Sequence, residues 1–351
     1  MRGVVFTGNR SLEIASFDDP TPGPNDAVVA IKASGMCGSD LRFYRLSPQE
    51  ALAAYGTAPE SLGDKIIGGH EPCGVVVELG EKVDSKSVKV GDRVMVYHYG
   101  GCGFCDSCRS GWSQMCDQGA TIYGATTNGG HADFMAVPAD RLIPLPDGLS
   151  FSAGAAISCG IGTAFQALVR LNLSARDTLA VFGQGPVGQS AVLFGTAMGA
   201  HVIAVDIEPS RVARATDFGA VHSLNSGDVD PVEAILELTD GKGVSCAVDA
   251  SGAAVARAAA VRSAAKWGRV AFVGEGGEVT LNVSHDILRK QLTILGSWTF
   301  SIAGQAECAR FSASHGVDID KVFTDRWSLA EAAEAYREFD KQSGGKAVFE
   351  L

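Results

Sequence analysis

The stretch that decides the fold is TLAVFGQGPVGQSAVLFGTAMGAHVIAVD, residues 178–206. An apolar run leads into a Gly-x-Gly-x-x-Gly turn at Gly183, Gly185 and Gly188, and a second apolar run ends in Asp206. Such glycines let the backbone approach a pyrophosphate at a helix N-terminus, and the later acidic residue binds ribose hydroxyls. The stretch therefore predicts a dinucleotide-binding βαβ unit, with a glycine turn that holds no dinucleotide as the alternative.

The same alternation of apolar strands and helices continues after this stretch and is absent before it. A helix is expected around 211–218, followed by the apolar runs SCAVDAS, RVAFVG and LTILGS. Alternating strands and helices predict a parallel, doubly wound sheet, the Rossmann arrangement, over residues 160–297. Residues 1–159 show short apolar runs between turns, and KAVFEL near the end resembles them, so a β-rich domain is expected from 1–159 and 298–351. The apolar stretch 149–171 between the two patterns is expected to be helical.

The predicted nucleotide site favours NAD over NADP. The carboxylate of Asp206 would repel a 2′-phosphate, whereas Arg211 lies close enough in sequence to weaken that preference and is expected at the adenosine edge. Backbone groups at the starts of helices and the ends of strands are expected to line the rest of the crevice. The expected contacts are Pro186, Val187, Ile207, Ser251, Gly274, Gly296 and Ser297.

Composition limits the classes of function. With 351 residues, the chain has the length of two domains, and 46% hydrophobic with 20% charged residues is typical of packed globular proteins. A net charge of -11 argues against nucleic acid as a partner, because binding a phosphate backbone requires a basic surface. Neither a signal peptide nor a membrane-spanning apolar run is recognisable, so a cytoplasmic location is expected.

A lobe of about residues 100–117 has the spacing of a structural metal site. Its cysteines are Cys102, Cys105, Cys108 and Cys116, spaced Cys-x2-Cys-x2-Cys-x7-Cys. Four thiolates around tetrahedral zinc leave no open position, so this site is expected to fold the lobe rather than to do chemistry. An iron–sulfur cluster and disulfides are the alternatives, although Asp117 stands where bacterial ferredoxin spacing has proline.

A second group of candidate ligands could leave a coordination position open. GMCGSD contains Cys37, GGHEPCG contains His70 with Glu71 beside it, and AAISCGIG contains Cys159 at the domain junction. A catalytic zinc takes about three protein ligands and one exchangeable one, which these residues could supply. Three further cysteines lack partners at metal spacing and are expected in the core: Cys73, Cys246 and Cys308.

From end to end, the chain resembles the medium-chain zinc dehydrogenases of the alcohol, sorbitol and threonine dehydrogenase type. The resemblance implies a GroES-like catalytic domain, with Cys37 and His70 as zinc ligands and Glu71 as a conditional one. Cys159 then takes the third protein position, where polyol members often carry glutamate. Asp40 matches the carboxylate that orients His70, and Ser39 matches the hydroxyl that accepts the alcohol proton.

Two features depart from that family pattern. Many relatives carry histidine where this chain has Arg42, and arginine cannot act as a base at ordinary pH, so solvent or Tyr44 is expected to complete the proton relay. Residues 41–66, between Cys37 and His70, also exceed the common spacing. This segment is expected to be a substrate lid, an oligomer contact or a solvated surface insertion.

The resulting hypothesis is a zinc-dependent enzyme that transfers hydride reversibly from a secondary alcohol to NAD. Polyol, sugar-derived and hydroxy-amino-acid alcohols are the expected substrates, with two zinc ions per chain and a homo-oligomeric assembly, dimer or tetramer. Cysteine at position 159 favours a primary-alcohol dehydrogenase as the alternative. A zinc-bearing quinone reductase-like or nucleotide-sensing relative is a further alternative. Trp298 could wall a substrate pocket or lie in a core or interface.

Overall fold

The computed structural model describes residues 1–53 and 65–351, which form two compact units. Unit 1 comprises Met1–Cys159, Ser301–Ser314 and Asp318–Leu351, and unit 2 comprises Gly160–Phe300 and His315–Val317. The first change of unit follows residue 159, where the sequence places it. The chain returns to unit 1 at residue 301 rather than 298, because the three residues after Ser297 pack with unit 2.

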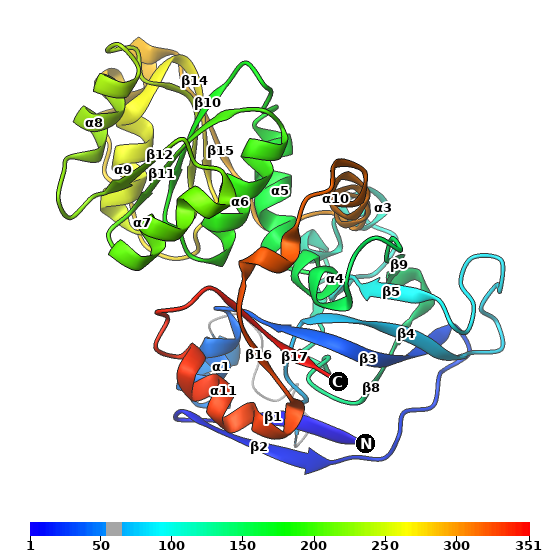
Figure 1. Cartoon of the computed structure of the whole chain (residues 1–351). Helices are drawn as coiled ribbons and strands as arrows, with labels where there is room; N and C mark the ends of the chain where they lie inside the picture. The colour runs from blue at the N-terminus through cyan, green and yellow to red at the C-terminus, as the bar shows by residue number, and fades with distance from the viewer. Residues whose placement is uncertain (54–64) are drawn as a thin grey trace. The chain divides into compact units, whose positions relative to one another are not determined.

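Unit 2 contains a six-stranded parallel sheet with the order β12-β11-β10-β13-β14-β15 (Figure 1). Its strands are β10 Thr178–Phe182, β11 His201–Asp206, β12 His222–Asn225, β13 Val244–Asp249, β14 Ala264–Phe272 and β15 Thr293–Gly296. Its helices are α5 Gly160–Arg170, α6 Pro186–Ala197, α7 Pro209–Ala215, α8 Pro231–Leu238 and α9 Ala254–Ser263. This arrangement confirms the predicted doubly wound sheet.

The strands of unit 2 are buried on both faces. In β10, Ala180 and Phe182 pack in one apolar cluster with Ile235 of α8 and residues of α9. The neighbouring Leu179 points to the other face, where a side-chain carbon added at Gly195 of α6 would lie 2.8 Å from it. Strands covered on both faces read as continuous apolar runs, which is why TLAVF and HVIAV identify this domain from sequence.

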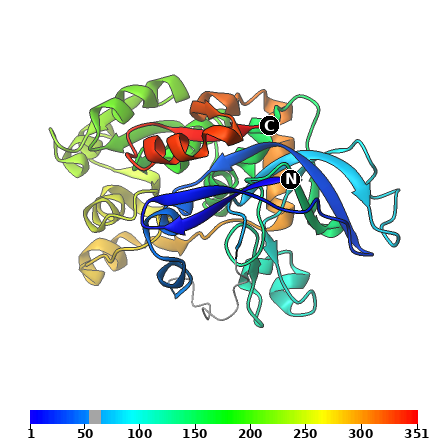
Figure 2. The same cartoon turned by 90° about the horizontal axis from the view of Figure 1, so that it is seen from below.

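The described part of unit 1 is built around a mixed sheet with the order β16-β17-β3-β4-β5-β9, with β8 also paired to β3. The sheet strands are β3 Asp26–Met36, β4 Glu71–Leu79, β5 Arg93–Val96, β8 Phe134–Pro138, β9 Leu142–Pro144, β16 Phe323–Trp327 and β17 Lys346–Glu350. Smaller ladders join β1 Arg2–Gly8 to β2 Ser11–Ser16 and β6 Tyr99–Gly100 to β7 Thr121–Ile122. Because β17 pairs with β3, both ends of the chain contribute to unit 1, as Figure 2 shows.

Short helices complete unit 1 and position its polar residues. They are α1 Asp40–Arg45, α2 Pro48–Ala53, α3 Asp106–Arg109, α4 Phe151–Ile157, α10 Ile302–His315 and α11 Ala332–Phe339, of which His315 falls in unit 2. The predicted lid, contact or insertion over 41–66 is described only in part, since residues 54–64 lie outside the described residues. Its described part forms α1 and α2.

The apolar stretch 149–171 is two helices rather than one. Helix α4 ends at Ile157, and α5 begins at Gly160, so Cys159 lies in the break between them. No single helix in the described part of the chain is long and apolar enough to cross a membrane. The bent pair of α4 and α5 meets that test together, by length and composition alone.

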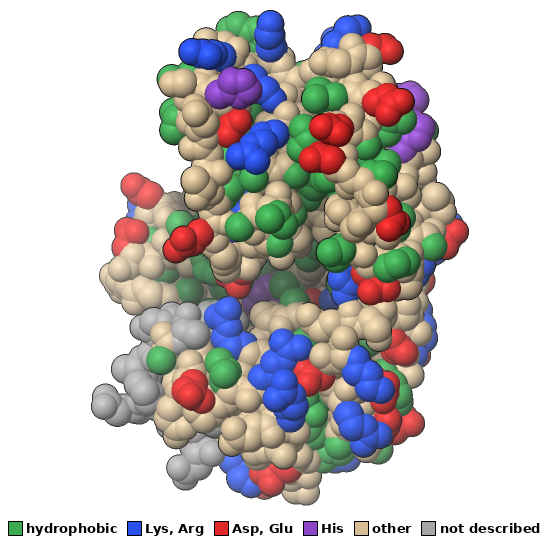
Figure 3. Space-filling model, turned by 90° about the vertical axis from the view of Figure 1, so that its left-hand side faces the viewer, with side chains coloured by type: hydrophobic (Ala, Val, Ile, Leu, Met, Phe, Trp, Pro, Cys, Tyr) green, Lys and Arg blue, Asp and Glu red, His purple; other side chains and the backbone are tan. Residues whose placement is uncertain are grey.

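Charged side chains of both signs are mixed on the surface. Figure 3 shows one face on which Lys and Arg side chains lie among Asp and Glu side chains. Ion pairs show the same mixing, since Asp340 contacts Arg10 at 2.8 Å and Arg45 at 2.5 Å. The face in Figure 3 therefore presents no uniform basic surface.

Candidate metal and cofactor sites

Four predicted ligands meet in unit 1. Cys37 follows the end of β3, His70 immediately precedes β4, Glu71 begins that strand, and Cys159 follows α4. One ligand atom from each of these residues lies within 4.8 Å of the others. Two sulfurs, an imidazole nitrogen and a carboxylate are a donor set that zinc prefers, and their close approach fits one ion.

Asp40 holds the imidazole of His70 in a fixed orientation. The Asp40 carboxylate is 1% exposed, and its Oδ1 lies 2.8 Å from Nδ1 of His70. Its Oδ2 accepts the backbone N–H of Cys37 at 2.8 Å. With Nδ1 committed to Asp40, Nε2 is the nitrogen directed into the cluster, where Ser39 Oγ lies 3.2 Å away. The structure thus brings Ser39, Asp40, Cys37 and His70 together.

The charges of the metal-free cluster suit a cation. A hydrogen bond from Cys159 lowers the pKa of Cys37 well below its ordinary value. The charges of His70 and Lys346 lower it further, and together these effects outweigh burial, which raises it. Burial opposes protonation of His70, but Asp40 and Cys37 outweigh it and raise its pKa well above the usual range. The pKa of Cys159 is raised by its hydrogen bond to Cys37 and by burial. Metal binding here must displace protons, as is usual for thiol and imidazole ligands.

Glu71 is held at the edge of the cluster by a buried lysine. Lys346, the first residue of β17, is 1% exposed and donates to Oε1 of Glu71 at 2.8 Å and to the carbonyl of Met36 at 3.2 Å. Nζ also lies 2.6 Å from Oε2 of Glu71, so the ion pair involves both carboxylate oxygens. A side-chain carbon at Gly35 would lie only 2.0 Å from Oε2, so glycine is required there.

The four-cysteine lobe closes on itself. The sulfur atoms of Cys102, Cys105, Cys108 and Cys116 all lie within 4.8 Å of one another. Backbone N–H groups point at them: Cys105 N donates to Cys102 Sγ at 3.4 Å, and Cys102 N donates to Cys116 Sγ at 3.3 Å. These donors lower the pKa of Cys102 and Cys116, which favours metal-binding thiolates.

Cys105→Ser is expected to prevent zinc binding in the lobe and to lower the thermal stability of unit 1. Its effect on the melting temperature should be larger than its effect on turnover. A structural zinc contributes its binding free energy directly to folding, and a serine hydroxyl does not replace a thiolate ligand. Metal analysis of the purified variant together with its melting temperature checks this. Retention of the full zinc content would contradict the four-cysteine assignment.

In unit 2, the predicted dinucleotide residues surround the carboxyl ends of the central strands. Gly183 has φ +90°, and a side-chain carbon at Gly188 would lie 1.7 Å from the Gly183 carbonyl oxygen, so both positions require glycine. Gly185 caps α6, whose first residues are Pro186 and Val187. Asp206 is 7% exposed and accepts backbone N–H groups from Gln184 at 2.5 Å and from Glu208 at 2.9 Å.

A cavity of 450 Å³ opens beside Asp206. Gly183, Ile207 and Ser251 from the sequence-predicted set also line it, and Asp230 adds a second carboxylate. Arg262 is the lining cation, and its Nε lies 3.6 Å from Asp286. The carboxyl ends of strands are where doubly wound sheets bind nucleotides, so the position suits the adenosine half of a dinucleotide.

The remaining predicted nucleotide residues lie elsewhere in unit 2. Arg211 belongs to α7 and is not among the described residues that line the cavity. Gly274 follows β14, Gly296 ends β15, and Ser297 donates its N–H to the carbonyl of Phe272 at 2.9 Å. Trp298 is 40% exposed and donates to Glu275 at 3.1 Å, so it is not a core residue. The contacts of these residues with a cofactor remain predictions.

The exposure of three cysteines and of Tyr44 tests the roles that the sequence predicts for them. Cys73, Cys246 and Cys308 are 0% exposed, and burial raises the pKa of each thiol, which confirms them as core residues. Tyr44 is 5% exposed in an apolar cluster, and burial raises its pKa. Its burial favours solvent over Tyr44 for the last proton transfer.

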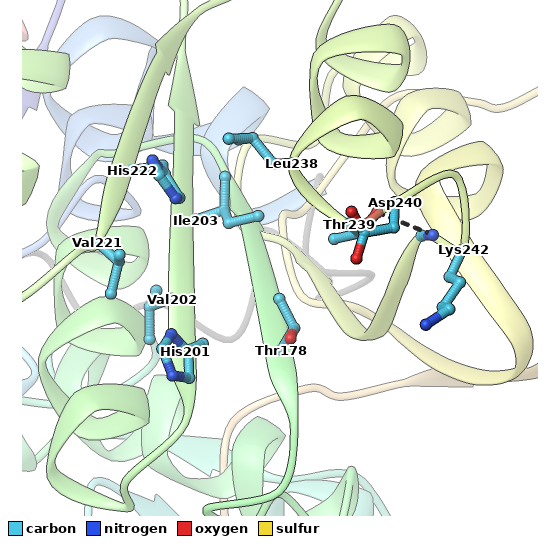
Figure 4. A pocket seen from close by; sticks show the side chains of 11 residues that line it. Thr178, His201, Val202, Ile203, Val221, His222, Leu238, Thr239, Asp240 and Lys242 are labelled. Carbon is cyan, nitrogen blue, oxygen red and sulfur yellow. Dashed lines mark hydrogen bonds between the residues drawn. The ribbon is translucent and has the colours of Figure 1, made fainter.

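A second cavity of 240 Å³ lies at the opposite end of the parallel sheet. Figure 4 shows that its side chains come from the amino ends of neighbouring strands and from the connection after α8. His201, His222, Asp240 and Lys242 in this cavity are all exposed. Because nucleotides bind at carboxyl ends of such strands, this cavity is not part of the predicted site.

Sequence reasoning missed several buried polar residues near the ligand cluster. Lys346 pairs with Glu71, and Tyr336 donates to Asp40 at 3.3 Å. His131 contacts Tyr336 in turn, with 2.7 Å between Nε2 and the hydroxyl oxygen. No local spacing identifies these partners, and the only signal is an ionisable or polar residue within an otherwise apolar stretch, as with Lys346 in KAVFEL.

Comparisons with known proteins agree with this geometry. Residues 23–147 match the family model described as an alcohol dehydrogenase GroES-like domain, and residues 186–314 match that of a zinc-binding dehydrogenase. The chain is 38% identical to an uncharacterized zinc-type alcohol dehydrogenase-like protein of Escherichia coli K12, covering 99% of this chain and 98% of that protein. It is 30% identical to the sorbitol dehydrogenase of Bacillus subtilis 168, covering 95% and 92%. The structure of an alcohol dehydrogenase from Thermus sp. ATN1 superposes with a TM-score of 0.88 at 26% identity, covering 100% and 99%.

Proposed function

The chain belongs to the medium-chain zinc alcohol dehydrogenase family, and from this premise we propose that it oxidises a secondary alcohol reversibly with NAD as the hydride acceptor. Membership of this family supports the oxidation and reduction of alcohols with a nicotinamide cofactor. The observation that carries the proposal is the convergence of Cys37, His70, Glu71 and Cys159 within 4.8 Å. The proposed assembly is a homo-oligomer, dimer or tetramer, as the family resemblance implies.

The proposed catalytic zinc would be held by Cys37, His70 and Cys159, with Glu71 as a conditional ligand. The structure supports this fit because the donors are of the right type and one ligand atom from each residue lies within 4.8 Å of the others. Zinc in such a site supplies a Lewis acid that lowers the pKa of an alcohol toward neutrality. A second zinc in the cysteine lobe would have a structural role.

The chain's own residues would orient the ligands and carry the proton. Asp40 keeps Nδ1 of His70 occupied, so that Nε2 serves as the ligand atom. Ser39 Oγ lies 3.2 Å from that nitrogen and is the hydroxyl placed to accept the alcohol proton. Arg42 cannot take the proton onward, because a guanidinium remains charged at ordinary pH. The proton would then leave Ser39 through solvent.

The preference for NAD would come from the acidic cavity beside β11. Asp206 and Asp230 both line it, and each would repel a 2′-phosphate. The carboxylate of Asp206 is fixed by two backbone N–H groups, so it can accept ribose hydroxyls without reorganising.

Asp206→Ala is expected to weaken NAD binding and to lower the ratio of kcat/KM for NAD to that for NADP by about 10- to 100-fold, the worth of a hydrogen bond to a charged group. Steady-state kinetics with both cofactors measures the ratio. Asp230→Asn is the comparison variant, because it removes a charge from the same cavity while its amide oxygen can still cap α8. It should lower the ratio less than Asp206→Ala, which also loses the ribose contacts. An unchanged ratio in Asp206→Ala would refute the ribose role.

The substrate class is proposed from the sorbitol dehydrogenase relative and the family resemblance. Polyols, sugar-derived alcohols and hydroxy amino acids are the candidates, and Cys159 favours primary alcohols as the alternative. A panel of these alcohols, followed by NADH absorbance with the zinc-loaded enzyme, tests the proposal. Turnover confined to primary alcohols would select the alternative. Absence of turnover with every alcohol would favour a quinone reductase-like or nucleotide-sensing role.

A further inference from the structure

A chain of buried hydrogen bonds continues behind Asp40, away from the ligand cluster. Tyr336 donates its hydroxyl to Oδ2 of Asp40 at 3.3 Å. Nε2 of His131 lies 2.7 Å from the same hydroxyl oxygen, and Nδ1 of His131 lies 2.7 Å from Oγ of Ser34. Ser34, His131 and Tyr336 are each 0% exposed. Residues from three separate segments of the chain thus form one connected polar path that leads through Asp40 to His70.

The backbone fixes the middle of this path. His131 lies in the loop before β8, where Val4 donates to its carbonyl at 2.9 Å and its own N–H donates to Gly68 at 3.0 Å. Gly69 has φ +84°, and a side-chain carbon there would lie 2.3 Å from Nδ1 of His131. The imidazole therefore occupies a slot that exists because residue 69 is glycine.

Aromatic rings enclose the path. Phe6 meets Tyr336 edge to face at 4.9 Å between ring centroids, and Phe349 meets His131 in the same way at 4.8 Å. Tyr44 packs on Tyr336 at 5.5 Å. Hydrogen bonds in such an apolar enclosure are stronger than in water, and an unpaired polar group there is costly.

The number of protons in the path fixes which group donates and which accepts in each of its hydrogen bonds. Burial lowers the pKa of His131 to about 4, so at neutral pH its ring has one donor and one acceptor nitrogen. Because Tyr336 gives its single proton to Asp40, its oxygen must accept from Nε2–H of His131. Nδ1 of His131 is then the acceptor for the Ser34 hydroxyl. Every proton in the path points toward the Asp40 carboxylate.

We infer that Tyr336 and His131 are positioning residues: they fix the Asp40 carboxylate so that His70 keeps its proton on Nδ1 and presents the Nε2 lone pair to zinc. This inference rests on the proposed function of the cluster as a zinc site. Asp40 accepts three donors, from the Cys37 backbone, Tyr336 and His70. Removing the Tyr336 hydroxyl takes one of them away and leaves Nε2–H of His131 without its acceptor.

The test is the affinity of the catalytic site for zinc in Tyr336→Phe. Competition with a chelator measures the affinity. Of the two steps in which zinc is removed, the one that is absent in Cys37→Ser belongs to the catalytic site. We expect about a tenfold loss, at the low end of what partners outside the ligand set contribute. The ligand-field absorption of the cobalt-substituted protein should also shift, because the orientation of the His70 ring changes. A purely structural tyrosine would alter the melting temperature and leave this spectrum unchanged.

Tyr44→Phe is the matched control. It removes a hydroxyl from the same aromatic cluster, next to Tyr336, without touching the path. Zinc affinity and cobalt spectrum should match those of the unaltered chain. If Tyr336→Phe does not fold, His131→Phe removes the next link while it preserves the aromatic contacts, and the same loss is expected.

A measurement on the unaltered protein keeps the inference falsifiable. Nitrogen-15 NMR of the histidine rings at neutral pH should show His131 protonated on Nε2 alone. Protonation of His131 on Nδ1 would overturn the inference, as would unchanged zinc affinity in a folded Tyr336→Phe. Failure of the unaltered chain to bind zinc at Cys37 and His70 would instead refute the proposed function, which separates the two failures.

Discussion

Cys37→Ser is expected to lower kcat/KM for alcohol oxidation by at least about 10⁴-fold while the chain stays folded, as is usual when one member of a catalytic unit is removed. The pKa of Cys37 is lowered by Cys159 and His70, so it supplies the anionic sulfur of the site. A serine hydroxyl stays protonated at neutral pH and binds zinc weakly. Steady-state NADH formation and metal analysis check both parts, with one zinc ion lost per chain.

Cys105→Ser is the matched variant for this experiment. It makes the same chemical change in the other cysteine site, where all four sulfurs converge and no ligand position is left open. The account predicts opposite profiles: loss of turnover with intact stability for Cys37→Ser, and loss of stability first for Cys105→Ser. The reverse pattern would mean that the structural and catalytic sites have been exchanged.

Lys346→Met is expected to destabilise the protein, by up to about 3–5 kcal/mol at alkaline pH, the usual cost of leaving a buried charge without its partner. Lys346 and Glu71 are 1% and 0% exposed, and Nζ contacts both carboxylate oxygens. Burial alone would lower the pKa of Lys346, but Glu71 and Cys37 raise it, so the lysine is charged in the folded state. Chemical denaturation of the whole chain measures the loss.

The deficit of Lys346→Met should grow with pH. Burial raises the pKa of Glu71 and Lys346 opposes that rise, so removing the lysine raises the pKa further above its unfolded value. A carboxyl with a raised folded-state pKa is stable as the neutral acid, and this stability is lost as pH increases through the folded-state value. Beside Lys346 the pKa of Glu71 is already raised to about 8, so the deficit should be nearly constant between pH 5 and pH 7 and should increase above pH 8.

A double variant, Lys346→Met with Glu71→Gln, is the control for the charge. It removes both ions and should recover a substantial part of the stability that the single variant loses, because no unpaired charge remains. If the single variant is as stable as the unaltered chain, or if the double variant is no better than the single one, the pair does not act as described.

The parts of the molecule that sequence predicts are those set by local spacing. The glycines at 183–188 lie close to one another in sequence, and so do the cysteines of the lobe. Their spacing alone therefore predicts how they are arranged in the folded chain. Resemblance to the family added Asp40 and Ser39, whose positions next to Cys37 follow the same logic. In the structure the four lobe cysteines converge, and Asp40 and Ser39 contact Cys37 and His70.

The parts that sequence could not predict depend on contacts between distant segments. Tyr336 lies 296 residues from Asp40, and Lys346 lies 275 residues from Glu71. Lys346 leads an apolar run and Tyr336 stands among charged residues of a helix, and in both places periodicity indicates at most burial and says nothing of a partner. The break between α4 and α5 was missed for a related reason, since nearly every residue on both sides is buried and the apolar pattern continues through it.

Alcohol oxidation is expected to depend on the zinc proposed to be held by Cys37, His70 and Cys159. The most direct test removes metal with a chelator and follows NADH formation while zinc is returned in known amounts. Activity should return in proportion to the zinc bound at this site and should not return in Cys37→Ser. Full NADH formation by protein whose Cys37 site holds no metal would contradict this expectation.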